Sequence, residues 1–188
     1  MKKIILISKI SVKILFALSL ITFLAAGCRE KKGCTNPAAA NFDKDAEEDD
    51  GSCIIRGCTD PMGLNYNAAA NSNDGSCQLA GTGGNTTIVA FPQHHGEPIF
   101  NFPNYRDTAY VKFNAQEFPG TSPSSYDAIF IGDHIGEDHV HLEGLKPGKY
   151  FIYMVGFDTT INQRVTGGIP YILTQASGEV DLNVPVTE

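Results

Sequence analysis

Residues 140–157 read VHLEGLKPGKYFIYMVGF, and this stretch is the clearest local indication of the fold class of the C-terminal part of the chain. Its hydrophobic side chains recur with a period of two, which is the pattern of a β-strand with one buried face. Pro147-Gly148 interrupts the pattern in the middle and predicts a turn. Six side chains on the two sides of this turn are expected to point into a core: Val140, Leu142, Leu145, Tyr150, Ile152 and Met154. The stretch therefore predicts a β-hairpin.

The same period of two recurs on both sides of the hairpin, over residues 85–188. Short hydrophobic runs are separated by Gly, Pro and Asp, which are turn residues. The predicted strands contain Thr87–Phe91, Ala109–Phe113, Ala128–Ile131, Val140–Leu142, Tyr150–Phe157, Ile169–Leu173 and Val180–Val186. Seven short strands of this kind predict an all-β sandwich domain over 85–188, preceded by a flexible Gly-rich linker over 78–84. Pro185 cannot donate to a β-ladder, so the last strand is expected at an edge.

The residues Leu145-Lys146-Pro147-Gly148-Lys149-Tyr150 also carry a family resemblance. They resemble the L-x-P-G-x-Y hairpin of transthyretin-like and carboxypeptidase-regulatory-like domains, while the rest of the domain shares only the architecture. The resemblance implies an immunoglobulin-like or transthyretin-like β-sandwich. Those domains are mostly non-catalytic, and some act as binding or structural attachments, but fold analogy alone assigns no function.

Two cysteine-framed segments precede the sandwich and repeat each other. Residues 33–53 read GCTNPAAANFDKDAEEDDGSC and residues 57–77 read GCTDPMGLNYNAAANSNDGSC, so the unit recurs at a spacing of 24 residues. A unit this short cannot bury a core, so we expect a disulfide to replace it. Four cysteines permit three pairings, and the pairing that closes each copy by itself joins Cys34 with Cys53 and Cys58 with Cys77. The cysteine spacing does not favour zinc.

The two segments resemble the GCTDPxAxNYNxxAxxDDGSC repeat of exported and surface proteins of Bacteroidetes-type bacteria. No catalytic activity belongs to that repeat, so the resemblance implies a spacer or an interaction module. The first copy also carries carboxylates that could offer oxygen ligands to Ca²⁺: Asp43, Asp45, Asp49 and Asp50. Three of these four are missing from the second copy, and the glycine spacing of an EF-hand is absent. A solvated acidic surface is the alternative.

The N-terminal residues 1–27 have the order of a bacterial export signal. Lysines precede an uncharged run of 13 residues, from Ile14 to Ala26, which is too short to span a bilayer of about 30 Å. The following Leu24-Ala25-Ala26-Gly27-Cys28 resembles a lipobox, in which the cysteine is acylated and becomes the first mature residue. The resemblance implies a lipoprotein whose Cys28 carries acyl chains such as palmitate, with a charged tether over 28–32. An ordinary secretory signal would instead leave Cys28 as an odd free thiol.

Charge and anchor together limit the partners of the chain. The net charge is −7, and the removable signal segment carries only lysines among its charged residues, so the mature chain is more acidic still and has no basic footprint for nucleic acid. Acyl chains would hold the protein on a membrane without a spanning helix. An Asp directly after the acylated cysteine would resemble an inner-membrane retention signal. Arg29 occupies that position here, which favours the outer membrane of the cell envelope.

Histidines offer the chain's candidate transition-metal ligands. His139 and His141 share one face of a predicted strand, and a His-x-His pair of this kind can bind Zn²⁺ or Cu²⁺. His94 and His95 are expected on opposite faces of their strand, so one of them at most would complete the site. Solvent-facing histidines without a ligand are the alternative.

No catalytic motif supports an enzyme. HExxH, GxSxG and phosphate-binding glycine loops are absent from the sequence. His94-x-x-Glu97 matches the short zinc signature of metallocarboxypeptidases, but the chain is too short for their catalytic domain. Several aromatic residues outside the predicted strand cores can form a patch for a glycan or a protein: Phe100, Phe102, Tyr105, Phe118 and Tyr126. The sequence thus predicts a non-catalytic, lipid-anchored structural, adhesion or ligand-binding module, with metal binding as the alternative.

Overall fold

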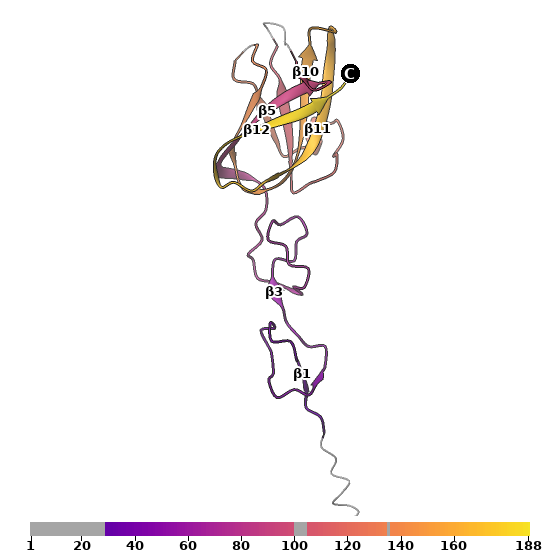
Figure 1. Ribbon diagram of the computed structural model, residues 1–188, viewed down its shortest axis with the longest axis vertical. Helices are drawn as coiled ribbons and strands as arrows, with labels where there is room; N and C mark the ends of the chain where they lie inside the picture. The colour runs from indigo at the N-terminus through magenta and orange to yellow at the C-terminus, as the bar shows by residue number, and fades with distance from the viewer. Residues whose placement is uncertain (1–28, 100–104, 135) are drawn as a thin grey trace, which may run out of the picture. The chain divides into compact units, whose positions relative to one another are not determined.

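The computed structural model describes residues 29–99, 105–134 and 136–188, and the predicted signal segment 1–27 and Cys28 lie outside these ranges. The chain divides into two compact units between Cys53 and Ile54. The first unit contains the first repeat, and the second contains the other repeat and the sandwich (Figure 1). Across the described ranges, no helix has the length and hydrophobicity needed to cross a membrane.

Each repeat is a short loop structure closed by one disulfide. The bonds are Cys34–Cys53 and Cys58–Cys77, so the pairing predicted from the repeat is confirmed. Each repeat also has a pair of two-residue parallel strands. In the first repeat these are β1 (Lys32–Gly33) and β2 (Glu48–Asp49), and in the second they are β3 (Arg56–Gly57) and β4 (Ser72–Asn73).

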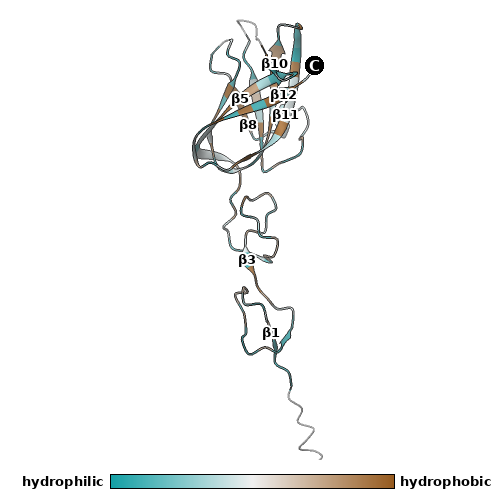
Figure 2. Cartoon of the chain, viewed as in Figure 1, coloured by the Kyte–Doolittle hydropathy of each residue, from teal (hydrophilic) through white to brown (hydrophobic). Residues whose placement is uncertain are grey.

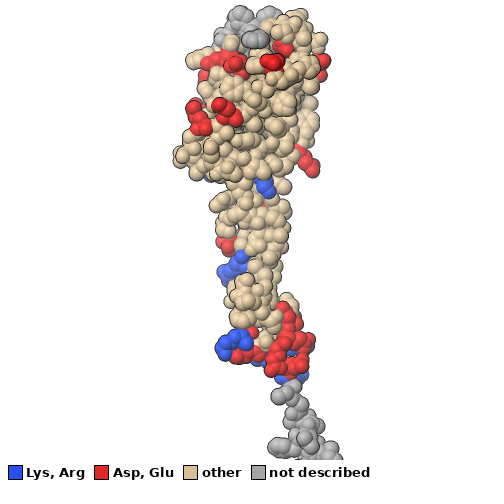
Figure 3. Space-filling view, viewed as in Figure 1, with Lys and Arg blue, Asp and Glu red and all other residues tan. Residues whose placement is uncertain are grey.

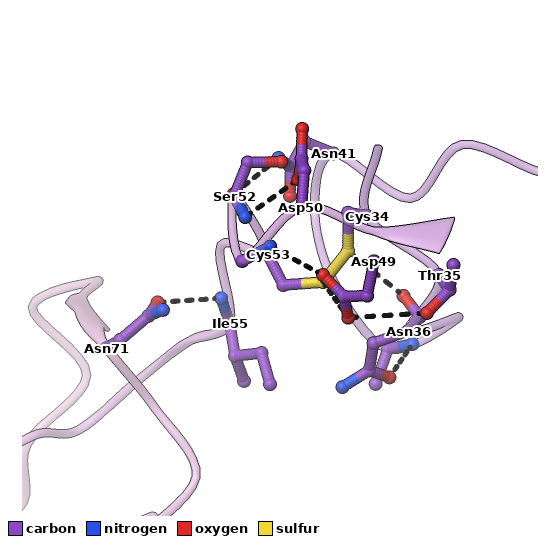
Figure 4. The surroundings of a disulfide bond; sticks show 12 residues. Cys34, Thr35, Asn36, Asn41, Asp49, Asp50, Ser52, Cys53, Ile55 and Asn71 are labelled. Atoms are coloured by element: carbon purple, nitrogen blue, oxygen red, sulfur yellow. Dashed lines mark hydrogen bonds between the residues drawn. A yellow bond between two sulfur atoms is a disulfide. The ribbon is translucent and has the colours of Figure 1, made fainter. Parts of the chain in front are cut away.

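The residues that the two repeats share build the turn before the second cysteine. In the first repeat, Asp50 Oδ1 accepts the Ser52 N–H at 2.9 Å, and Asn41 Nδ2 donates to the Ser52 carbonyl at 2.7 Å (Figure 4). Asp74, Ser76 and Asn65 make the same two bonds in the second repeat, at 2.9 and 2.7 Å. These hydrogen bonds, together with the disulfide, hold the turn in each repeat.

The sandwich consists of two sheets. The first sheet is antiparallel and has the order β11 (Gln163–Leu173), β10 (Gly148–Asp158), β7 (Thr108–Phe113) and β8 (Ala128–Ile131). The second sheet has the order β12 (Ser177–Val186), β5 (Thr82–His94) and β6 (Glu97–Pro98), with β9 (Val140–Leu145) also paired to β5. Strand β12 runs parallel to β5 and lies at the edge of this order, as Pro185 predicts. A 3-10 turn, η1, covers Pro123–Ser125.

The core lies between the two sheets and confirms the predicted all-β sandwich. Hydrophobic and hydrophilic segments alternate along its strands in Figure 2, as expected for strands with one buried face. All six side chains predicted to face the core from the 140–157 hairpin are fully buried: Val140, Leu142, Leu145, Tyr150, Ile152 and Met154. Gly144, at a φ of 69°, supplies the extra residue that lets both Leu142 and Leu145 point inward.

The structure differs from the sequence-based expectation at the start of the sandwich. Strand β5 begins at Thr82, inside the Gly-rich stretch 78–84 that was expected to be a flexible linker. Ala80 is 9% exposed and packs against the core, and its N–H donates to Asn114 Oδ1 at 2.8 Å. Because Gly148 has no side chain, the backbone at Ala80 can lie directly against it. Within the stretch, Gly84 also serves close packing, because a Cβ there would overlap the Leu145 carbonyl oxygen.

Candidate functional site

The outer face of the β11-β10-β7-β8 sheet is hydrophobic, which is unusual for a sheet surface that does not face the core. On β10, Phe151, Tyr153 and Val155 alternate with the core residues and point outward, yet they are only 5–6% exposed. The connection between β7 and β8 supplies part of this cover, because Tyr126 packs onto them. We call this surface the aromatic face. Its side chains come from strands β7, β8 and β10 and from that connection: Tyr110, Phe118, Tyr126, Ile129, Ile131, Phe151, Tyr153 and Val155.

Tyrosine and phenylalanine rings contact one another across this face. Tyr153 lies at the centre, with its ring centroid 5.5 Å from Phe118, 5.9 Å from Tyr126 and 6.2 Å from Tyr110. Tyr126 donates its hydroxyl to the Gly120 carbonyl at 2.7 Å, which holds the connection in place. Burial first, and the neighbouring Tyr153 second, raise the pKa of Tyr126 to about 12. The phenol group therefore stays neutral at physiological pH.

A groove of about 340 Å³ opens at the aromatic face. The described residues that line it are all uncharged: Phe118, Thr121, Phe151, Tyr153, Thr166, Gly167 and Gly168. Gly168 is required beside the ring of Phe151, because a Cβ there would lie 2.7 Å from Phe151 Cε1 and 2.7 Å from the Ile152 carbonyl oxygen. Phe118 is 52% exposed and offers a ring to solvent at the groove.

The aromatic patch expected from the sequence is found in part. Phe118 and Tyr126 lie on the aromatic face, whereas Tyr105 contacts Phe157, with 5.9 Å between the ring centroids. Phe100 and Phe102 lie outside the described residues. The contribution of Tyr110, Phe151 and Tyr153 was not predicted from the sequence. The unbroken hydrophobic run of β10 was a usable signal, since a strand without polar alternation is buried on both faces.

His139 and His141 lie together on the outer face of the other sheet. Their ring centroids are 4.9 Å apart, and each Nδ1 is paired with a carboxylate. The distances are 2.9 Å from His139 to Asp138 and 3.1 Å from His141 to Asp133. The predicted sharing of one face by the two histidines is therefore present.

His94 and His95 lie next to each other at the end of β5. The expectation that they point to opposite faces is wrong, because His95 has a φ of 53° and begins the two-residue turn into β6. This left-handed backbone conformation brings the rings together, with their centroids 4.1 Å apart. His94 is buried, and its Nδ1 lies 2.9 Å from Asp158 Oδ2 while its Nε2 lies 2.8 Å from Glu188 Oε2. Hydrogen bonds to Asp158 and then to Glu188 raise the pKa of His94.

The four histidines do not form one site. His139 packs against Phe91 of β5, with 5.3 Å between the ring centroids, and His94 is three residues further along β5, about 10 Å at the usual rise of a strand. Among the residues that the structure describes, one group of three has ligand atoms close enough to hold an ion. It consists of His94, His95 and Glu188, whose ligand atoms lie within 4.8 Å of one another.

The carboxylates proposed as calcium ligands in the first repeat have other partners. Asp43 forms an ion pair with Lys31 at 2.7 Å, and Asp45 pairs with Lys44 at 2.8 Å. Asp49 accepts the Gly51 N–H at 2.8 Å, while Asp50 accepts that of Ser52. The hydrogen bond from Lys31 is the main cause that lowers the pKa of Asp43. Charged side chains of both signs gather over this repeat in Figure 3.

When the chain is compared with protein-family models, with curated proteins and with solved structures, no match is found.

Proposed function

We propose that the chain is a lipid-anchored binding protein of the bacterial cell envelope, and that it holds a neutral glycan on the aromatic face of its sandwich. The groove at Phe118 carries this proposal. It combines an exposed aromatic ring with threonine hydroxyls and backbone at Gly167-Gly168, and its described lining is uncharged. A sugar ring presents C–H groups on one face and hydroxyls at its edge, so it matches an aromatic surface bordered by hydrogen-bonding groups.

The anchor part of the proposal rests on the sequence around Cys28. A lysine-rich segment, a short apolar run and a lipobox-like Leu24–Cys28 precede the first structured repeat. Acylation of Cys28 would attach the protein to the outer membrane, and two disulfide-closed repeats suit an oxidising compartment. The repeats would then act as a spacer or an interaction module before the sandwich.

A binding assay with matched variants tests the ligand. The full chain would be incubated with a panel of immobilised neutral polysaccharides, and the retained fraction measured for the wild type, for Phe118→Ala and for Tyr66→Ala. Tyr66 is the control because it is a similarly exposed aromatic residue, at 44%, in the second repeat. We expect at least one polysaccharide to be retained, with affinity reduced about tenfold or more by Phe118→Ala and unchanged by Tyr66→Ala.

Two results would overturn the glycan proposal. One is the absence of retention on every polysaccharide, and the other is an equal loss in both variants. The anchor is tested separately by mass spectrometry and detergent-phase partitioning of the protein made in a bacterial host. The wild type is expected to carry acyl chains and enter the detergent phase, and Cys28→Ala is expected to do neither. Detergent partitioning of both proteins alike would contradict lipidation.

A further inference from the structure

The end of β5 carries a second cluster of functional groups, distinct from the aromatic face. His94 is 6% exposed, whereas His95 and Glu188 are exposed to solvent. Their ligand atoms lie within 4.8 Å of one another, and no other described group of three His, Cys, Asp or Glu residues meets that criterion. Two imidazoles and a carboxylate form a donor set typical of zinc sites that keep one position open.

The buried histidine is held in the orientation that metal binding requires. Its Nδ1 lies 2.9 Å from Asp158 Oδ2, and Asp158 is 4% exposed. Asp158 Oδ1 in turn accepts the backbone N–H of Thr160 at 2.8 Å and its hydroxyl at 2.6 Å. With its Nδ1–H donating to a carboxylate, His94 points its Nε2 toward Glu188, and loss of the proton between these two groups would leave the Nε2 lone pair available to a metal ion. Metal-binding histidines almost always have an outer carboxylate or carbonyl partner of this kind.

The backbone also fixes the second imidazole beside the first. His95 has a φ of 53° and Gly96 a φ of 86°, so the turn between His94 and Glu97 has positive φ at both central residues. Such turns prefer Asn, Asp or Gly at the first of these positions. A histidine there is held in a less favourable conformation, and observed strain of this sort often marks a functional position. The result is a pair of rings stacked 4.1 Å apart.

We propose that His94, His95 and Glu188 bind one Zn²⁺ ion, with Asp158 as the outer carboxylate on His94. The ion would take the place of the proton that bridges His94 Nε2 and Glu188 Oε2, which are 2.8 Å apart. Ligand atoms about 2.0 to 2.1 Å from a tetrahedral ion lie roughly 3.4 Å from one another. The exposed side chains of His95 and Glu188 can close the remaining distance by rotation, while His94 stays in place.

Isothermal titration of Zn²⁺ into the purified full chain tests the proposal. We expect one ion per chain with micromolar or tighter affinity. His95→Ala and Glu188→Gln each remove an exposed ligand and should weaken binding about tenfold or more. The matched control is His139→Ala/His141→Ala, which also removes imidazoles but leaves this cluster intact, and its affinity should equal that of the wild type. Urea unfolding of every variant shows whether the sandwich remains folded.

Cobalt gives an independent spectroscopic measurement. Co²⁺ bound with tetrahedral geometry should produce visible absorption bands that Zn²⁺ abolishes on titration, and His95→Ala should lack these bands. The proposal is overturned if the wild type shows no heat of binding at about 100 μM Zn²⁺, well above the affinities of protein zinc sites. It is also overturned if the His139→Ala/His141→Ala protein loses binding while His95→Ala retains it.

Discussion

The two sheets of the sandwich share one core but present different surfaces to solvent. The outer face of β11-β10-β7-β8 is the aromatic face. The outer face of the other sheet carries polar and charged side chains, and the ladder aligns His141 with Val89 and Val89 with Asp181 across its strands. We call it the polar face. Asp and Glu side chains are visible on the side of the sandwich that shows β5 and β12 in Figure 3.

A polar outer face is the usual arrangement in a two-sheet fold, whereas a hydrophobic outer face such as the aromatic face is not needed to build the sandwich. A sandwich is stable when each sheet buries one face, so the outward side chains are free to be polar. The aromatic face adds a second hydrophobic cluster outside the core, and its groove leaves Phe118 exposed. Exposed hydrophobic surface of this kind marks interaction sites in soluble proteins. The polar face is therefore ordinary solvated surface, whereas the aromatic face is a second buried cluster that leaves part of its hydrophobic surface available to a ligand.

The largest expected effect distinguishes the two faces by stability. Tyr153→Ala removes a ring that is 6% exposed and contacts three other rings, so we expect the free energy of unfolding to fall by about 3 kcal/mol. Phe91→Ala removes a half-buried ring that contacts His139 on the polar face, and should cost about 1 kcal/mol. Urea unfolding measures both. Equal losses would mean that the two outer faces contribute alike.

The next effect concerns the glycine beside the groove. A Cβ at residue 168 would lie 2.7 Å from Phe151 Cε1 and 3.0 Å from Tyr153 Cα, so Gly168→Ala must displace the ring or the backbone. We expect a loss of about 2 kcal/mol from this overpacking. Gly132→Ala is the control, because its Cβ would have 3.4 Å to the nearest atom, the His139 carbonyl oxygen. If Gly168→Ala is as stable as the control, the groove is wider than the ring contacts imply.

A pH effect of intermediate size is expected at Tyr126. Burial raises the pKa of its phenol to about 12, against 10.0 in the unfolded chain. The folded state therefore holds the proton more tightly, so the contribution to stability is complete below pH 10 and is lost between pH 10 and about 12. Unfolding measured over this range, with tyrosinate absorbance recorded in parallel, gives the size of the loss. The free energy of unfolding of Tyr126→Phe should decline less steeply over this pH range than that of the wild type. An identical decline in both proteins would mean that groups other than Tyr126 cause it.

Sequence periodicity was sufficient for the parts of the fold that depend on local pattern. The hairpin over residues 140–157, the disulfide pairs and the edge position of β12 each follow from neighbouring residues or from repetition. The start of β5 could not be predicted from neighbouring residues, because the packing of Ala80 on Gly148 joins residues that are distant in sequence. A Gly-rich stretch looks alike whether its glycines provide flexibility or close contact.

The candidate sites depended still more on long-range geometry. His94 meets Glu188 only because β12 runs parallel to β5 and ends beside it. His95 lies beside them because its φ is positive. The His95-Gly96 pair predicts this conformation only if it is recognised as a two-residue turn with positive φ at both positions. The aromatic face requires knowledge of which strands neighbour β10 and of what covers them. Residue types were visible in the sequence, but their juxtaposition was not.

The smallest expected effect is on the polar face, and it tests whether that face is as dispensable as the comparison implies. Asp133→Asn and Asp138→Asn each remove a carboxylate paired with a histidine, and the carboxylate side chains are 58% and 52% exposed. A histidine–carboxylate pair carries opposite charges only when the histidine is protonated, and an exposed pair contributes about 0 to 1 kcal/mol even then, because water and salt screen it. We therefore expect each variant to unfold within about 0.5 kcal/mol of the wild type near neutral pH, with the difference vanishing in high salt. A salt-independent loss well above 1 kcal/mol would show that the histidine–carboxylate pairs hold the 133–141 segment in place, and the polar face would then have a structural role.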